Sequence, residues 1–335
     1  MKCADPVLCY VLSSFQKVYR HFSLASDSLK YLHRIKKDPV FNCGKCLYCR
    51  KKRALELASK CVLHSSLYQQ NCFLTLTYDE KKEGYHNEFE YQDIQKFKKR
   101  LRSYVSRRYN SRRIEIFNVH EYGKNGKKHW HLIVFNFDFA DKTVLSKTAE
   151  VTLFSSVTLE RLWGFGFVSI GDVTTASAMY QSQYCEKDFK NGNVSSSKKS
   201  HSQHSGIGKP YFLKHYKQIL TLGYVPVAGR KMPVPRSFQK IAHKHWCHFY
   251  EKSAFFDTPE RKALYRPFKA GLENKELADL WPVYKSMKAE VIKKYEDEWD
   301  EVISRYLTTG RDPDFMLSNE NALHDLHRKQ QTERF

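Results

Sequence analysis

The sequence has no long hydrophobic run. No stretch of about 18 consecutive apolar residues occurs in the 335-residue chain, which excludes a transmembrane helix of ordinary length. The first residues lack the apolar stretch and the small-residue cleavage site of a secretory signal, so we expect a cytosolic protein. A Gly-x-x-x-x-Gly-Lys-Ser/Thr loop is missing as well, which argues against a nucleotide-driven helicase in this chain.

Acidic residues are scarce relative to basic ones. The chain has 57 Lys plus Arg against 36 Asp plus Glu, a formal net charge of +21, which predicts attraction to a polyanion such as nucleic acid. Nine of the basic residues and no acid lie within residues 96–113. This run is either a solvated helix face or a track for DNA phosphates. Its candidate DNA-binding residues are Lys98, Lys99, Arg100 and Arg102.

The nine cysteines are an odd number, so they cannot all pair within one chain. In a reducing compartment they are free thiols or metal ligands. Cys43, Cys46 and Cys49 offer three soft ligands at a spacing that suits a structural Zn²⁺, or they are reduced thiols in a tight turn before a helix. The candidates for a fourth zinc ligand are Cys3, Cys9, Cys61, Cys72 and His33.

Hydrophobic periodicity predicts an α+β fold, an antiparallel sheet with flanking helices and a C-terminal helical extension. Predicted helices cover 50–68, 91–108, 158–163, 174–188 (with Thr174 as a cap) and 290–307. Predicted strands cover 71–79, 114–122, 129–137 and 167–170, with a hairpin turn at 123–126. Composition divides the chain into a Cys-rich N-terminal segment and helix (1–68), a central domain (69–240) and a helical C-terminal region with a polar tail (241–335).

Two histidines flank Trp130 at the start of a predicted strand. Residues i and i+2 of a strand project from one face, so His129 and His131 point together while Trp130 points away. Glu121, near the end of the preceding strand, could add a carboxylate and complete a site for Mg²⁺ or Mn²⁺, which would polarise a phosphodiester. The alternative is structural: two satisfied histidines and a surface glutamate.

Two tyrosines lie one turn apart in a predicted helix. Tyr180 and Tyr184 share a face, and Lys187 is close to the same stripe. Tyrosines at this spacing usually belong to a core, but polar residues 181–183 separate this pair. A phenolate can act as a covalent nucleophile. Because the ordinary tyrosine pKa is about 10, a metal ion or Lys187 would have to favour the ionised form.

The order of these segments resembles the three motifs of HUH-type rolling-circle replication initiators. The segments are FLTLTY at 73–78, Glu121 with His-Trp-His at 129–131, and Tyr-x-x-x-Tyr-x-x-Lys at 180–187. The cysteine motif at 43–50, the segment 93–102 and Gly-Ile-Gly-Lys-Pro at 206–210 resemble, more narrowly, the replication proteins of gokushovirus-type Microviridae, which are small single-stranded DNA phages. The resemblance covers roughly residues 41–240.

The resemblance implies an HUH endonuclease with an RRM-like core, acting as a metal-dependent nickase and strand transferase. His129, His131 and Glu121 would hold the metal, and Tyr180 and Tyr184 would be paired nucleophiles assisted by Lys187. One tyrosine would cut single-stranded or supercoiled phage DNA at the replication origin, leaving a 5′-phosphotyrosyl link and a 3′-OH primer. The second would allow the displaced strand to be rejoined. Host helicase and polymerase are the implied partners, in the host cytoplasm.

Two other functions are open at this point. A non-catalytic protein that binds single-stranded nucleic acid would use the histidines structurally and would form no covalent product. A hydrolytic metal phosphodiesterase would use water as its nucleophile and would keep cleaving without both tyrosines.

Overall fold

The computed structural model divides the chain into two compact units, one of residues 54–241 and one of residues 1–53 with 242–335. The structure describes residues 3, 7–11, 17–26, 30, 40–44, 46–82, 90–122, 127–149, 151–187, 200–201, 206–250 and 271–309. None of the helices in these ranges combines the length and the apolar character that a bilayer crossing requires.

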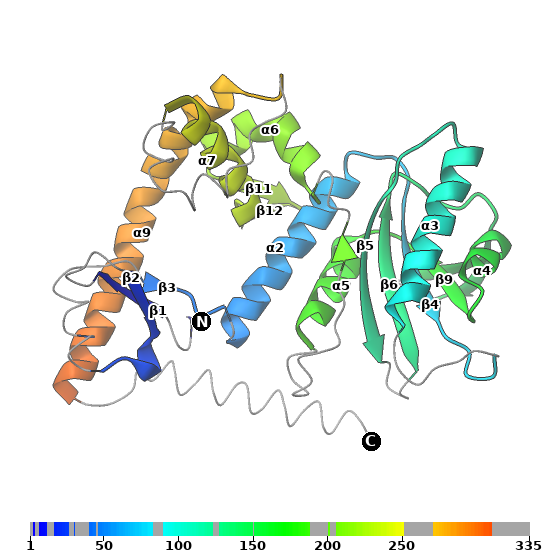
Figure 1. The fold of residues 1–335 in the computed structure, drawn as a ribbon, viewed down its shortest axis with the longest axis horizontal. Helices are drawn as coiled ribbons and strands as arrows, with labels where there is room; N and C mark the ends of the chain where they lie inside the picture. The colour runs from blue at the N-terminus through cyan, green and yellow to red at the C-terminus, as the bar shows by residue number, and fades with distance from the viewer. Residues whose placement is uncertain are drawn as a thin grey trace. The chain divides into compact units, whose positions relative to one another are not determined.

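An antiparallel sheet organises the unit of residues 54–241 (Figure 1). Its seven described strands run in the order β10-β5-β6-β4-β9-β8-β7. They are β4 (Asn71–Thr77), β5 (Glu115–Tyr122), β6 (Lys128–Phe135), β7 (Lys142–Lys147), β8 (Thr152–Ser156), β9 (Val168–Gly171) and β10 (Ser200–His201). The strand β4 therefore pairs with both β6 and β9, which follow it much later in the chain.

One face of this sheet carries α3 (Tyr91–Arg108) and α4 (Val157–Trp163) (Figure 1). Alternate residues of β6, namely Trp130, Leu132 and Val134, are fully buried there against the apolar stripe of α3. The Trp130 indole donates a hydrogen bond to the Tyr78 hydroxyl at 3.1 Å, so its polar atom is satisfied inside the core. This side of β6 serves packing.

The other face carries α2 (Leu47–Ser65) and α5 (Thr175–Lys187) (Figure 1). Ile133 and Phe135 of β6 are fully buried with Ala58 of α2 and Ala178 of α5. Because side chains alternate along a strand, the His129 and His131 side chains extend this row towards the start of β6. The same sheet face thus changes from apolar to polar along one strand.

A close approach of the chain fixes the end of β4. The Thr77 and Asp79 amides donate to the carbonyls of Phe167 and Phe165 at 2.8 and 2.9 Å. Gly166, between these two residues, has φ +154°, and a Cβ there would lie 2.4 Å from the Thr77 carbonyl oxygen. Glycine is therefore required at this position, and the contact holds the strand end that carries Thr77.

Two helices and a hairpin follow the sheet in sequence. They are α6 (Lys209–Leu222), β11 (Tyr224–Val227), β12 (Arg230–Pro233) and α7 (Arg236–Tyr250). The rings of Phe212 and Phe238 stack with centroids 4.9 Å apart, and both side chains are buried. This stacking joins α6 to the first turn of α7.

The unit of residues 1–53 and 242–335 brings together distant parts of the sequence. Its described sheet has the order β2-β1-β3, from β1 (Val7–Val11), β2 (Lys17–His21) and β3 (Val40–Phe41), and its long helix is α9 (Lys275–Thr309). Leu8, Phe22 and Ile303 are fully buried in one cluster. The Lys30 ammonium lies 3.8 Å from the ring centroid of Tyr306, a cation–π contact between the two ends of the chain.

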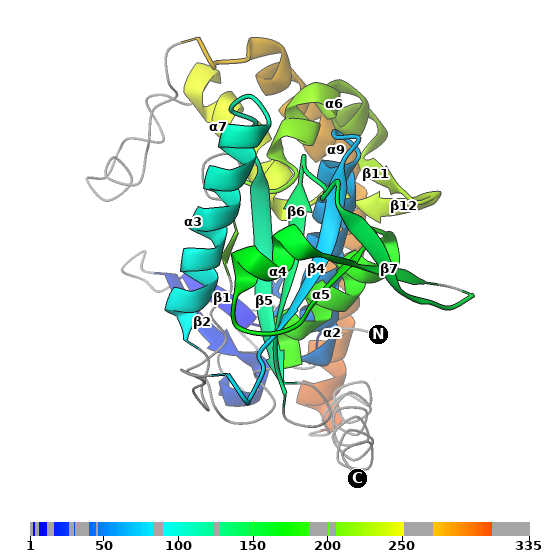
Figure 2. The ribbon, with the colours of Figure 1, turned by 90° about the vertical axis from the view of Figure 1, so that its right-hand side faces the viewer.

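The predicted α+β class is confirmed. The helix predicted over 91–108 has these bounds, and Thr174 caps α5 because its hydroxyl accepts from the Ser177 amide at 3.1 Å. Periodicity did not predict β7, because nearly all of its residues are exposed and show no alternation. The turn at 123–126 and the tail from 310 onward lie outside the described residues. Figure 2 shows β7 at the outer edge of the sheet.

Candidate active site

Three neighbouring strands present polar side chains at one rim of the sheet. Thr77 of β4 and Glu121 of β5 both lie opposite His129 of β6, and Thr75 of β4 lies opposite His131. Opposed residues in an antiparallel pair project from the same face, so these side chains gather on the side that carries α5. The register thus confirms that Glu121 and the two histidines share a rim.

Each imidazole is held by a threonine hydroxyl. Nδ1 of His131 lies 3.1 Å from Oγ1 of Thr75, and Nδ1 of His129 lies 2.9 Å from Oγ1 of Thr77. When Nδ1 donates its proton to the hydroxyl, Nε2 keeps a lone pair for a cation. The sequence prediction missed both threonines, although their i, i+2 spacing on a strand was a signal for them.

Replacing Thr75 and Thr77 with valine is expected to lower Mn²⁺ affinity by about 10–100-fold, because each imidazole loses the partner that orients it. Valine keeps the shape and the strand preference of threonine, so the fold should be retained. Isothermal titration with Mn²⁺ measures the effect. Thr143→Val, which removes a hydroxyl bonded to Ser155 at 2.8 Å on β7, is the matched control. Unchanged Mn²⁺ affinity in the double variant would contradict the assigned role.

One carboxylate oxygen contacts both a histidine and a tyrosine. Oε2 of Glu121 lies 3.0 Å from Nε2 of His131 and accepts a hydrogen bond from the Tyr180 hydroxyl at 3.3 Å. The side chains of His131 and Glu121 are only 6% and 12% exposed, whereas Tyr180 is 44% exposed. The acceptor is therefore shielded while the phenol is open to a polymer.

A buried amide anchors α5 to the sheet beneath the tyrosine. Nε2 of Gln181 donates to the carbonyls of Phe117 and His131 at 2.9 and 3.2 Å. Gln181 is fully buried, so these bonds fix the helix against both β5 and β6. Tyr184 and Lys187 lie on the same helix, with Tyr184 one turn beyond Tyr180, but their side chains are outside the described ones.

The donor set fits a divalent cation in part. Adjacent ligands of an octahedral ion with bonds of about 2.1 Å are about 3.0 Å apart, which matches the 3.0 Å between His131 Nε2 and Glu121 Oε2. The His129 ring is nearly parallel to that of His131, with centroids 6.2 Å apart, so it would have to turn inward to share the ion. Burial, with the neighbouring His131, lowers the pKa of His129, which keeps the imidazole neutral as a ligand must be.

Known proteins resemble this chain over the segment that builds the site. A family model for replication-associated proteins of the ORF2 type matches residues 71–189. The replication-associated protein VP4 of Bdellovibrio phage phiMH2K is 31% identical over 295 residues, which are 84% of this chain and 85% of that protein. The chain belongs to the phage replication-associated proteins.

Two further members extend the comparison. Replication-associated protein ORF4 of Chlamydia phage 1 is 30% identical over 254 residues, 72% of this chain and 62% of that protein. Replication-associated protein ORF2 of Spiroplasma virus 4 is 30% identical over 268 residues, 73% of this chain and 82% of that protein. These are proteins of gokushovirus-type microviruses, and membership supports a role in phage replication. No solved structure matches.

The region matched by the family model contains the whole candidate site. Residues 71–189 begin at β4, with its two threonines, and end just after α5, with its two tyrosines. The three cysteines at 43–49 lie outside it. They do meet a fourth thiol, Cys3, whereas Cys61 and Cys72 are buried in two separate cores.

The predicted DNA-binding residues of α3 lie across the sheet from this site. Lys99, Arg100 and Arg102 are exposed, although Arg100 also donates to the Leu162 carbonyl at 2.8 Å. Lys98 is only 8% exposed, and its ammonium donates to Asn118 Oδ1 at 3.0 Å. The structure therefore corrects the prediction for Lys98: its helical position places it against the sheet, out of reach of a phosphate.

The buried Lys98 predicts a pH-dependent stability. Burial, reinforced by Arg102, lowers the pKa of Lys98 to about 8. Between this pH and the unfolded pKa of about 10.4, the unfolded chain holds a proton that the folded chain has lost, so the lysine's cost to stability fades as pH rises. The stability of Lys98→Met relative to wild type should therefore be highest at pH 7 and fall towards pH 10. Urea unfolding at several pH values measures this, and a gap independent of pH would contradict it.

Proposed function

We propose that the chain is an HUH-type rolling-circle replication initiator, an origin-specific, metal-dependent single-strand DNA endonuclease with a tyrosine nucleophile. One observation carries the proposal: the Tyr180 hydroxyl and His131 Nε2 meet on the same Glu121 oxygen, at 3.3 and 3.0 Å. A tyrosine that served only packing would have no need of an ionisable acceptor at a shielded rim. The similarity to phage replication-associated proteins supports the same conclusion.

In the proposed step, the Tyr180 oxygen attacks the phosphorus of one phosphodiester at the origin. A bond forms between the tyrosine oxygen and phosphorus, and the bond from phosphorus to the 3′ oxygen breaks. The phenolic proton leaves towards the Glu121 carboxylate, and a proton ends on the departing 3′ oxygen. The products are a 5′-phosphotyrosyl link and a free 3′-OH, which can prime a polymerase.

The side chains around Tyr180 have separate tasks in this step. When bound, Mg²⁺ or Mn²⁺ would supply positive charge that stabilises the phosphorane-like transition state. His129, His131 and Glu121 would hold that cation, Thr75 and Thr77 would orient the imidazoles, and Gln181 would fix the helix. All of these tasks use one face of β6 and its neighbours, which leaves the opposite face for the core.

The second tyrosine and the partners complete the proposed cycle. Tyr184, with Lys187 near its stripe, would cut after one round of copying, so that the released strand is closed into a circle. The exchange conserves the phosphodiester bond energy, so rejoining needs no ATP. Host helicase and polymerase would act with the protein on single-stranded or supercoiled phage DNA in the host cytoplasm.

A second candidate, a coat of single-stranded DNA without catalysis, is favoured by the net charge of +21. Exposed cations such as Lys99 and Arg102 would then bind phosphates, and the histidine pair would be scaffolding. Binding by charge predicts affinity that falls steeply with salt for any sequence. Origin specificity and a covalent product distinguish the two functions.

The deciding experiment is a search for protein joined to DNA. The full chain is incubated with circular single-stranded phage DNA, and with origin oligonucleotides labelled at either end, in Mn²⁺, Mg²⁺ or EDTA. We expect a metal-dependent adduct on a denaturing gel that carries the 3′-end label, because the protein keeps the 5′ phosphate of the downstream fragment. Cleavage without an adduct would indicate water as the nucleophile. Binding without cleavage would leave only the coating function.

A further inference from the structure

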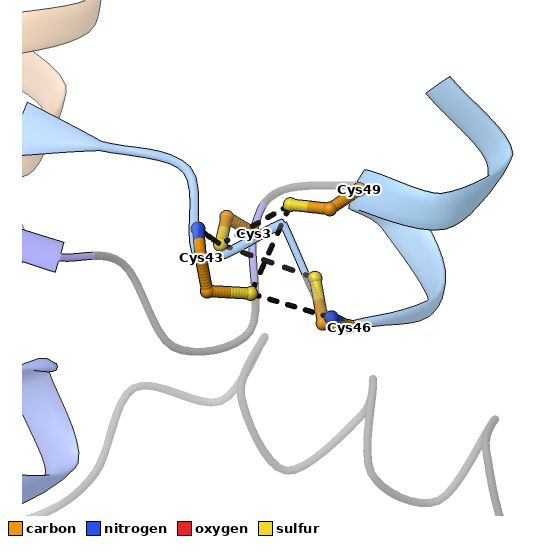
Figure 3. A group of neighbouring side chains, drawn as sticks. All are labelled: Cys3, Cys43, Cys46 and Cys49. Atoms are coloured by element: carbon orange, nitrogen blue, oxygen red, sulfur yellow. Dashed lines mark hydrogen bonds between the residues drawn. The ribbon is translucent and has the colours of Figure 1, made fainter. Parts of the chain in front are cut away.

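Four cysteines from two distant segments converge in the unit that contains both chain ends (Figure 3). Cys3 lies near the start of the chain, Cys43 and Cys46 lie in the turn after β3, and Cys49 is in the first turn of α2. All four Sγ atoms lie within 4.8 Å of one another. Cys3 and Cys49 are buried, and the other two are half-buried.

The sulfur separations are those of a single tetrahedral ion. With a Zn–S bond of about 2.3 Å, neighbouring sulfurs of a tetrahedron are about 3.8 Å apart. The separations are 3.9 Å for Cys43 to Cys49, 3.9 Å for Cys46 to Cys3 and 3.6 Å for Cys49 to Cys3. A disulfide would hold two sulfurs at about 2.05 Å, far closer than any of these pairs. A multi-iron cluster would push the sulfurs further apart around its inorganic core.

The backbone around the sulfurs is arranged to stabilise negative charge. The Cys43 amide donates to Cys3 Sγ at 3.2 Å, and the Cys46 amide donates to Cys43 Sγ at 3.3 Å. Gly44, between these cysteines, has φ +72°, and its carbonyl accepts a hydrogen bond from the Arg53 guanidinium. Cys49 also lies at the positive end of α2. Four thiolates so close together would repel one another unless they shared a cation.

We propose that Cys3, Cys43, Cys46 and Cys49 bind one structural Zn²⁺ ion. Four protein ligands close the coordination sphere, so the site is structural and has no open position for a substrate. It fastens the start of the chain to the turn before α2, 40 residues away in sequence. The site shares no residue with the His129, His131 and Glu121 rim, so it stands whether or not the nickase function does.

The test measures metal content and sulfur ligation in the full chain, purified without chelators. Mass spectrometry of the metals should find one zinc ion per chain, which a thiol-specific mercurial releases. Substitution with Co²⁺ should give the intense thiolate-to-cobalt absorption of a tetrahedral sulfur site. His131→Ala should leave zinc and spectrum unchanged, and so should Cys247→Ser, which alters a buried thiol outside the cluster. Absence of zinc, or iron in its place, would overturn the proposal.

Two ligand variants connect the metal to these residues. Loss of an outer partner already weakens metal binding by about 10–100-fold, so Cys3→Ser should weaken zinc by more than this in a chelator competition. Cys49→His keeps a ligand at the position, so it should retain the metal and weaken the cobalt–thiolate absorption. A folded Cys49→His protein, checked by circular dichroism, with the wild-type cobalt spectrum would refute the assignment. Wild-type zinc affinity in Cys3→Ser would refute it equally.

Discussion

Replacing Tyr180 with phenylalanine is expected to abolish the covalent protein–DNA adduct and to slow origin cleavage by at least about 1000-fold, the scale on which loss of a covalent nucleophile is felt. The change removes one oxygen, the atom that would attack the phosphorus and that now donates to Glu121 Oε2 at 3.3 Å. The ring remains, so its edge-to-face contact with His131, at 5.4 Å between centroids, should persist. Single-turnover cleavage of an origin oligonucleotide measures the rate.

The neighbouring Tyr122 gives a matched control for this substitution. It is 51% exposed, similar to the 44% of Tyr180, and it follows Glu121 directly on β5, where alternation turns it to the other face. Tyr122→Phe should therefore cleave like wild type. Tyr184→Phe should keep the first cleavage and lose rejoining of the displaced strand. An adduct that survives in Tyr180→Phe and disappears in Tyr184→Phe would reverse the assigned order of the two tyrosines.

Replacing His131 with alanine should also remove metal-dependent cleavage, by about three orders of magnitude. A bound cation contributes several kcal/mol to the transition state, and each 1.36 kcal/mol is about a factor of ten in rate. The substitution removes a metal ligand and, at the same time, the partner that holds Glu121 Oε2 at 3.0 Å. The rate at saturating DNA across a Mn²⁺ titration separates weaker metal binding from slower chemistry.

His120→Gln is the control for loss of a histidine from this sheet. His120 is as buried as His131, at 4% and 5% exposure, but it packs on Trp130 with ring centroids 5.3 Å apart, on the opposite face. This variant should lose thermal stability and keep the wild-type dependence on Mn²⁺. Wild-type cleavage by His131→Ala, or cleavage in EDTA, would rule out the proposed role of the histidine.

Local patterns were sufficient to predict the central part of the site. The period of two along β6 separates His129 and His131 from Trp130, and the structure confirms that Trp130 is in the core while the histidines line the other face. The hairpin prediction placed Glu121 close to His129, and the register pairs them. Both relations involve neighbours in sequence, where strand geometry and turn chemistry leave few alternatives.

Relations between distant segments could not be predicted in this way. Thr75 and Thr77 face the histidines only because β4 pairs with β6 across the whole of α3, a choice that the packing of the sheet decides. The partner of the three clustered cysteines was likewise open among five candidates, because Cys3 lies 40 residues from Cys43. Lys98 is the opposite case: it lies four residues after Ile94 and three before Leu101, so helical spacing already indicated the buried stripe.

The alternation along β6 has a consequence for how this protein can evolve. Trp130 and Leu132, which hold the fold, are interleaved residue by residue with His129 and His131, which face the candidate chemistry. A mutation on one parity would lower the amount of folded protein, and a mutation on the other would lower activity per folded molecule. Ligands at this rim can therefore be exchanged for others without repacking the core. A phage lineage could change its metal preference or its origin while it inherits the same scaffold.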